Sequence, residues 1–219
     1  MDLWLFSSGD SESNAATDEL LMKQVRSKHS DFTFIATNVD EADEYYDEFI
    51  DRFSSYGYTR FHMIIPGKEI TKKQLKILLS SDLVYLSGGN TFDLLGNLRQ
   101  SAMMTALRGY AKVGILAGHS AGAIIMSPNI KTASYPDFDC DMNRKGYQDW
   151  RALQLVQFEF FPHYSVRSGY DNDLISASSE VSHPIYGVED GGAIRVTDLQ
   201  TTFFGRVWGY VNGRRVKVR

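Results

Sequence analysis

The chain has 219 residues, 43 % of them hydrophobic and 13 % aromatic, and this composition excludes a disordered or low-complexity protein. Its 23 basic and 27 acidic residues give a formal net charge of −4, which argues against a nucleic-acid partner because no broad cationic surface is available to neutralise phosphates. A chain of this length can bury enough apolar surface for one core, so we expect a single domain over residues 1–219.

Cysteine content and the first residues bear on the cellular compartment. Cys140 is the one cysteine, which rules out an intrachain disulfide and a multi-cysteine metal site and suits a reducing compartment. Asp2 stands where a signal peptide would carry Lys or Arg, and no run approaches the roughly 18 apolar residues of a membrane helix. We therefore expect a cytoplasmic protein without membrane contact.

Short apolar runs alternate with amphipathic segments, which is typical of β-α-β units around a buried parallel sheet. The runs that we expect to form strands are Leu3–Phe6, Phe32–Ala36, Phe61–Ile65, Leu83–Leu86 and Val113–Leu116. The pattern predicts an α/β fold.

Helices are expected between these strands. The first follows Asn38, which can cap it, and shows a continuous apolar stripe. Its stripe consists of Ala42, Tyr45, Tyr46, Phe49, Ile50 and Phe53. Thr71 and Gln74 have the spacing of a capping box, which predicts the start of a second helix. A third is expected to begin near Asn90–Thr91 and to end at Gly109.

The second half of the chain is less regular. Ser127–Trp150 lacks periodicity and is expected to cross the surface, with Asp137, Asp139 and Asp141 in a solvated loop because the spacing of a calcium loop is missing. Near the end of the chain, the Asn212-Gly213 pair predicts a two-residue hairpin turn.

The segment Gly118-His119-Ser120-Ala121-Gly122 directly follows a predicted strand and precedes a helix-compatible run. This G-x-S-x-G pattern in a strand–turn–helix context predicts a nucleophile elbow, with the Ser120 hydroxyl above the sheet edge. An oxyanion hole could be formed by the backbone N–H of Ala121 and one from the Gly88-Gly89 pair, which ends the strand Leu83–Leu86. The pattern therefore indicates acyl transfer by a serine.

A serine nucleophile needs a base and an acid that orients the base. We expect His163 to be the base, because Pro162 ends the apolar run Phe158–Pro162 and leaves this histidine in a loop at the carboxyl end of a strand. The candidate acids are Asp190 and Glu189, which follow the strand Ile185–Val188. Asp190 is preferred because it lies nearer the Gly191-Gly192 turn, and Glu189 remains the alternative.

Four motifs together resemble a known family. They are Gly88-Gly89-Asn90-Thr91, Gly118-His119-Ser120-Ala121-Gly122, Pro162-His163-Tyr164 and Gly187-Val188-Glu189-Asp190. In this order they are similar to the signature of the peptidase E family of aspartyl dipeptidases, which includes cyanophycinases, and the resemblance covers roughly residues 1–195. It implies a three-layer α/β/α sandwich with a mostly parallel sheet, flavodoxin-like and related to class I glutamine amidotransferases. It also implies a Ser-His-Glu triad, whose roles fall here on Ser120, His163 and Asp190.

Two positions depart from the family pattern. Asp190 stands where the family has glutamate, and Ser168–Ile175 lacks the arginine that holds the substrate's aspartate carboxylate. Arg167 is the nearest basic residue and is our candidate for that contact, with Gly88 and Asn90 as further substrate-binding residues.

These observations predict a serine peptidase that cleaves small peptides, with a possible aspartyl preference and without a metal or organic cofactor, as a monomer or homodimer. A glutamine amidotransferase would need cysteine at position 120, and an α/β-hydrolase esterase would place its acid before its histidine in the chain. The other alternative is a member of the fold that binds a ligand but has lost turnover.

Overall fold

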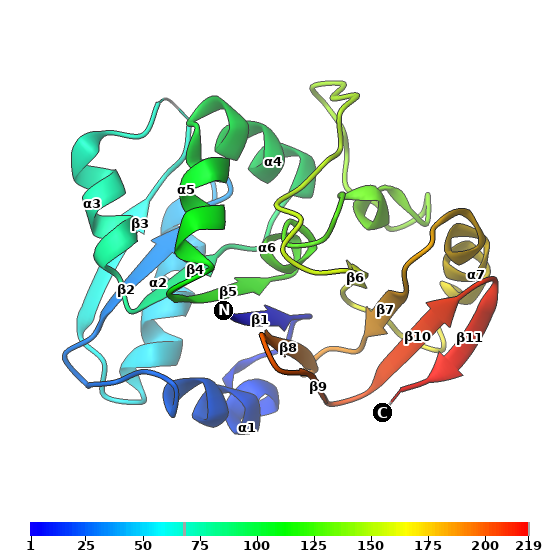
Figure 1. Ribbon diagram of the computed structural model, residues 1–219, viewed down its shortest axis with the longest axis horizontal. Helices are drawn as coiled ribbons and strands as arrows, with labels where there is room; N and C mark the ends of the chain where they lie inside the picture. The colour runs from blue at the N-terminus through cyan, green and yellow to red at the C-terminus, as the bar shows by residue number, and fades with distance from the viewer. Residues whose placement is uncertain (68, 219) are drawn as a thin grey trace.

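The computed structural model describes residues 1–67 and 69–218 (Figure 1). Its strands are β1 (Asp2–Phe6), β2 (Asp31–Ile35), β3 (Arg60–Ile64), β4 (Leu83–Leu86), β5 (Ile115–His119), β6 (Glu159–Phe161), β7 (Ile185–Val188), β8 (Ala193–Thr197), β9 (Thr201–Phe204), β10 (Val207–Val211) and β11 (Arg214–Lys217). Its helices are α1 (Ser11–Met22), α2 (Ala42–Ser54), α3 (Lys72–Ser80), α4 (Thr91–Gln100), α5 (Met103–Tyr110), α6 (Ala121–Ile124), α7 (Asp171–Glu180) and the 3₁₀ helix η1 (Lys131–Ser134).

The central sheet has the strand order β3-β2-β4-β5-β1-β8-β9. Its first five strands are parallel, and β8 and β9 are antiparallel additions at one edge. Successive side chains of β1 alternate between its faces: Leu3 and Leu5 pack with α3, α4, α5 and α6, whereas Trp4 and Phe6 pack with α1 and α2. Helices therefore cover both faces, which confirms the predicted α/β/α sandwich with a mostly parallel sheet.

A smaller sheet with the order β11-β10-β7-β6 lies beside the central one (Figure 1). Strands β6 and β7 are parallel, and α7 packs on this sheet through Leu174 and Ala177 against Ile185 and Tyr210. The sequence did not distinguish these strands from those of the central sheet. This matters for the site, because His163 follows β6 and Asp190 follows β7.

Several boundaries differ from those predicted. The fifth strand begins at Ile115, and Val113 lies in an exposed turn. The helix expected from Thr91 to Gly109 is two helices, because Ala102 adopts a left-handed conformation with φ 58° and Ser101 returns its hydroxyl to the carbonyls of the preceding turn. Helices α1 and α7 were not predicted.

Other local predictions agree with the structure. The capping box of Thr71 and Gln74 starts α3, and Asn212 and Gly213 form the left-handed turn between β10 and β11. Asn38 accepts the N–H of Glu41 through its side chain, but the residue at the N-cap of α2 is Glu41.

The segment 127–150 is more tightly attached than a solvated loop. The Asp141 carboxylate accepts a hydrogen bond from the N–H of Thr91 at 2.8 Å, and the Asp139 carboxylate accepts one from the Tyr170 hydroxyl at 2.6 Å.

Over residues 1–67 and 69–218, no helix is long and apolar enough to cross a bilayer.

The close packing of the turn between β5 and α6 requires glycine at two positions. A Cβ atom on Gly122 would lie 2.2 Å from the carbonyl oxygen of Leu86, and one on Gly118 would lie 2.2 Å from that of Gly122.

Gly122→Ala should therefore lower the free energy of unfolding by about 3 kcal/mol, because the backbone must move to admit the methyl group. Gly109→Ala is the control, since a Cβ there meets no atom within 4 Å, and helix propensity should make it neutral or slightly stabilising. Urea denaturation followed by circular dichroism measures both, and equal stabilities would contradict the packing described.

Candidate active site

Ser120 lies at the turn between β5 and α6 with an uncommon backbone conformation, φ 51° and ψ −111°. Its N–H donates to the carbonyl oxygens of Phe6 and Ser7 at 3.0 and 3.1 Å, which ties the turn to the end of β1. Such a conformation in a non-glycine residue persists only where the surroundings enforce it, and it is often found at functional sites. The serine hydroxyl is thus held at the carboxyl edge of the central sheet.

The structure brings Ser120, His163 and Asp190 into one chain of hydrogen bonds. The Ser120 Oγ lies 2.8 Å from His163 Nε2, and His163 Nδ1 lies 3.1 Å from Asp190 Oδ1. When Nδ1 carries the ring proton and donates it to Asp190, Nε2 has a free lone pair for the serine hydroxyl. The hydrogen bond from His163 also holds the pKa of Asp190 below its ordinary value.

The two candidate acids lie apart. Glu189 faces Arg206, with 3.6 Å between its Oε2 and the guanidinium, and its N–H pairs with the Arg206 carbonyl. Asp190 alone of this pair is hydrogen-bonded to His163.

Ser7, which sequence reasoning missed, supports both members of the histidine–aspartate pair. This buried hydroxyl accepts the His163 N–H at 2.7 Å, and its Oγ lies 2.9 Å from the Val188 carbonyl oxygen and 3.2 Å from Asp190 Oδ1, the two acceptors for its one proton. A serine after a buried strand gave no signal in the sequence, because small polar residues are common at strand ends.

Backbone donors are available near Ser120. Across residues 1–67 and 69–218, the N–H groups of Gly89 and Ala121 have no protein acceptor. Gly89 has φ +104°, a conformation that favours glycine, and a Cβ there would lie 3.2 Å from Oε2 of Glu41.

Two predicted substrate-binding residues lie elsewhere. Asn90 caps α4 by accepting the Asp93 N–H at 3.0 Å and donates to the Met142 carbonyl at 3.1 Å, so its side chain serves the fold. Arg167 is exposed on the loop after β6 and is not one of the residues that line the cavity at Ser120. Gly88 and Gly89 do line that cavity.

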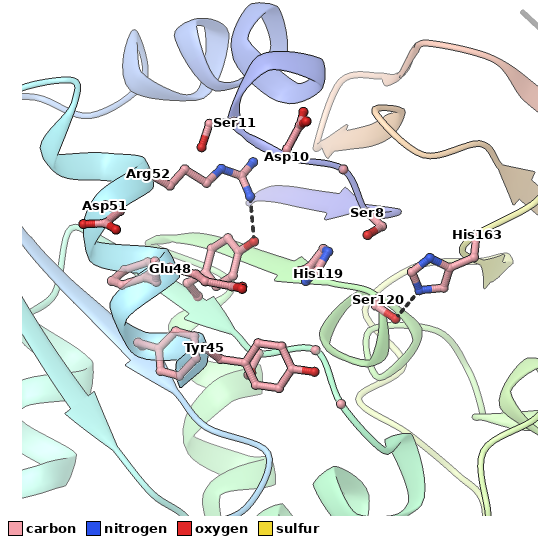
Figure 2. Close-up of a pocket in the computed structure, with 17 residues that line it drawn as sticks. Ser8, Asp10, Ser11, Tyr45, Glu48, Asp51, Arg52, His119, Ser120 and His163 are labelled. Atoms are coloured by element: carbon pink, nitrogen blue, oxygen red, sulfur yellow. Dashed lines mark hydrogen bonds between the residues drawn. The ribbon is translucent and has the colours of Figure 1, made fainter. Parts of the chain in front are cut away.

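The cavity has a volume of about 610 Å³, which is within the range of small-ligand sites. Figure 2 shows Ser120 and His163 at one end, Asp51 and Arg52 of α2 at the other, and His119 between them. The sequence predicted the first end of this cavity but not the second. Among the described residues, no group of three or more His, Cys, Asp or Glu side chains is arranged to hold a metal ion.

His119 is a neutral side chain in the middle of this cavity. Burial, with a smaller contribution from the charge of Arg52, lowers its pKa to about 4. Its Nδ1 lies 3.1 Å from the position that a Cβ of Gly88 would take, and its buried Nε2 has no hydrogen-bond partner within the described chain.

The family model of Peptidase family S51 matches residues 3–203. The chain belongs to peptidase family S51. An uncharacterized peptidase of Pasteurella multocida is 32 % identical over 147 residues, which are 64 % of this chain and 67 % of that protein. Peptidase E of Escherichia coli O1:K1 is 28 % identical over 143 residues, 60 % of this chain and 59 % of the relative.

A solved structure with a related fold agrees with this assignment. A putative peptidase E from Listeria monocytogenes superposes with a TM-score of 0.73 and 25 % identity, over 92 % of this chain and 96 % of that one. The sequence matches span 42 % to 67 % of the length of the first three curated relatives. Family membership confirms the resemblance to peptidase E and the class of serine-type peptidase.

The lowered pKa of His119 predicts how this S51 protein responds to acid. The ordinary pKa of histidine is 6.5, whereas that of His119 in the folded chain is about 4. Between these two pH values, the unfolded chain binds a proton at His119 that the folded chain does not bind. Stability should therefore fall as the pH falls through this window, by roughly 2–3 kcal/mol from this residue.

His119→Gln removes the titrating group while keeping a polar side chain. Urea denaturation at pH 7 and pH 4.5 should show a smaller loss of stability in His119→Gln than in the unchanged protein. The same loss in both proteins would contradict the neutral, buried state of His119.

Proposed function

We propose that this protein hydrolyses small peptides by acyl transfer to Ser120, with His163 as the general base and Asp190 as the residue that orients it. The observation that carries the proposal is the hydrogen-bond chain Ser120–His163–Asp190, with distances of 2.8 and 3.1 Å. Its geometry matches the requirement that a nucleophile contact a base and the base contact an orienting group. The motif resemblance supports the same roles.

In the proposed reaction, His163 Nε2 takes the proton of Ser120 as Oγ attacks the peptide carbonyl carbon. The developing oxyanion accepts hydrogen bonds from the N–H groups of Ala121 and Gly89. His163 then gives its proton to the leaving amine, and the same base activates the water that releases the acyl group. Asp190 stabilises the imidazolium at each stage, and the nucleophile is a protein side chain, so no step calls for a cofactor.

The intact hydrogen-bond chain favours turnover over a silent ligand-binding role, and labelling of Ser120 by a fluorophosphonate would separate the two. An aspartyl preference is not part of the proposal, because Arg52 is the cationic side chain lining the described cavity and it is already paired. The proposal retains the small-peptide substrate and the cytoplasmic location expected from the sequence.

Ser120→Ala and His163→Ala should each lower kcat by about 10⁴-fold, because the first removes the nucleophile and the second removes the base that activates it. A library of dipeptides and blocked peptides provides the substrates, and circular dichroism verifies that each variant is folded. More than a tenth of the original turnover in either folded variant would refute the proposed roles.

Asp190→Asn and Glu189→Gln form a matched pair for the acid. Asp190→Asn should lower kcat by about 10³-fold, because an amide cannot stabilise the imidazolium and favours the wrong tautomer. Glu189→Gln should change kcat by about twofold at most, since it removes only an ion pair at the surface. The opposite ranking would assign the role to Glu189.

A further inference from the structure

The charges around the cavity are unbalanced. Asp10, Glu48 and Asp51 line it, and within residues 1–67 and 69–218 none of these carboxylates forms an ion pair. Asp10 accepts the N–H of Ser13 at 2.8 Å, which keeps its pKa low and its carboxylate ionised at neutral pH. The cavity therefore carries fixed negative charge.

The one cationic side chain in the described lining does not offset this charge. Arg52 donates from Nε and Nη2 to both carboxylate oxygens of Asp18, at 2.7 and 2.5 Å, and from Nη1 to the Tyr85 hydroxyl at 3.0 Å. Its side chain is 11 % exposed and that of Asp18 is fully buried. A bidentate pair of this kind neutralises the guanidinium, so a substrate carboxylate would find no free cation here.

Aromatic side chains also line the cavity. Phe34, Tyr45, Phe49 and Tyr85 line the cavity, and the neutral His119 adds no positive charge. The rings suit an alkyl stem and also attract a cation through their faces. Burial and the nearby charges of Glu41 and Glu48 raise the pKa of Tyr45, which is consistent with the negative potential along α2.

His119 also lines the cavity. Its buried Nε2 has no hydrogen-bond partner within the described chain. Figure 2 shows this ring lying between the serine–histidine pair and the α2 side chains.

We propose that this cavity selects peptides bearing a cationic group beside the scissile bond, with Glu48 as the main specificity-determining residue. The group is an ammonium or guanidinium, from a Lys or Arg side chain or from the peptide's own N-terminus. Glu48 lies on α2 one turn after Tyr45 and one turn before Arg52, and it lines the cavity together with the aromatic side chains. The inference rests on the proposed peptidase function and adds its substrate class.

The test uses short fluorogenic peptides that differ at one residue, which is Lys, norleucine or Asp, on either side of the scissile bond. Norleucine keeps most of the lysine stem and removes the charge. We expect kcat/KM to be about tenfold or more higher for Lys than for norleucine, and lowest for Asp, as one charge-assisted contact provides. Each peptide is assayed with a free and with an acetylated N-terminus, and a preference that disappears on acetylation identifies the terminal ammonium as the source.

Glu48→Gln should remove most of the Lys-over-norleucine preference through KM, while kcat for the norleucine peptide stays near its original value. Asp47→Asn is the matched control, since this neighbouring carboxylate on α2 is exposed and does not line the cavity, and the preference should be unchanged. A preference for Asp or norleucine peptides, or equal losses on Lys and norleucine peptides in Glu48→Gln, would overturn the inference. Cleavage of no peptide by the unchanged protein would instead refute the proposed function itself.

Discussion

The hydroxyl of Ser7 is the contact on which the geometry of the site depends. It lies where β1 of the central sheet ends, and it binds the backbone of His163 and approaches the carboxylate of Asp190, which both come from loops of the smaller sheet. The neighbouring carbonyls of Phe6 and Ser7 hold the N–H of Ser120. One strand end therefore sets the position of all three groups, and a buried network of this kind is rigid when each member is satisfied.

A second constraint is the buried ion pair of Arg52 and Asp18, which lies between the cavity and the aromatic core. Arg52 and Asp18 bury opposite charges against Phe6, Phe53 and Tyr85, with the guanidinium 4.8 Å from the ring centre of Phe6. Removing either partner would leave an uncompensated buried charge, so this pair is part of the fold and not a free binding group. The exposed carboxylates around it are thus free to determine which charge the cavity accepts.

Much of this arrangement was accessible from the sequence. The G-x-S-x-G spacing placed Ser120 at a turn between strand and helix, and Pro162 placed His163 beyond a strand end, because glycine and proline restrict the backbone locally. The second sheet was not accessible, since the pairing of β6 with β7 and of β7 with β10 depends on contacts between distant residues. Arg167 was expected near the substrate from its proximity to His163 in sequence, but proximity along a loop does not determine where a side chain points. Glu48 gave no signal because periodicity identifies the buried face of α2 and not the function of its exposed flank.

Ser120 comes from the central sheet, whereas His163 and Asp190 come from the smaller sheet, and this origin affects how activity is lost. Most of the helical residues lie in α1 to α6, which pack on the central sheet, so the helical signal of the protein reports mainly on that sheet and its helices. The distance between Ser120 and His163, however, exists only while the two sheets are docked, and proton transfer requires that distance to stay near hydrogen-bond length. Turnover therefore reports on the docking of the two sheets, which the helical content of the protein does not measure.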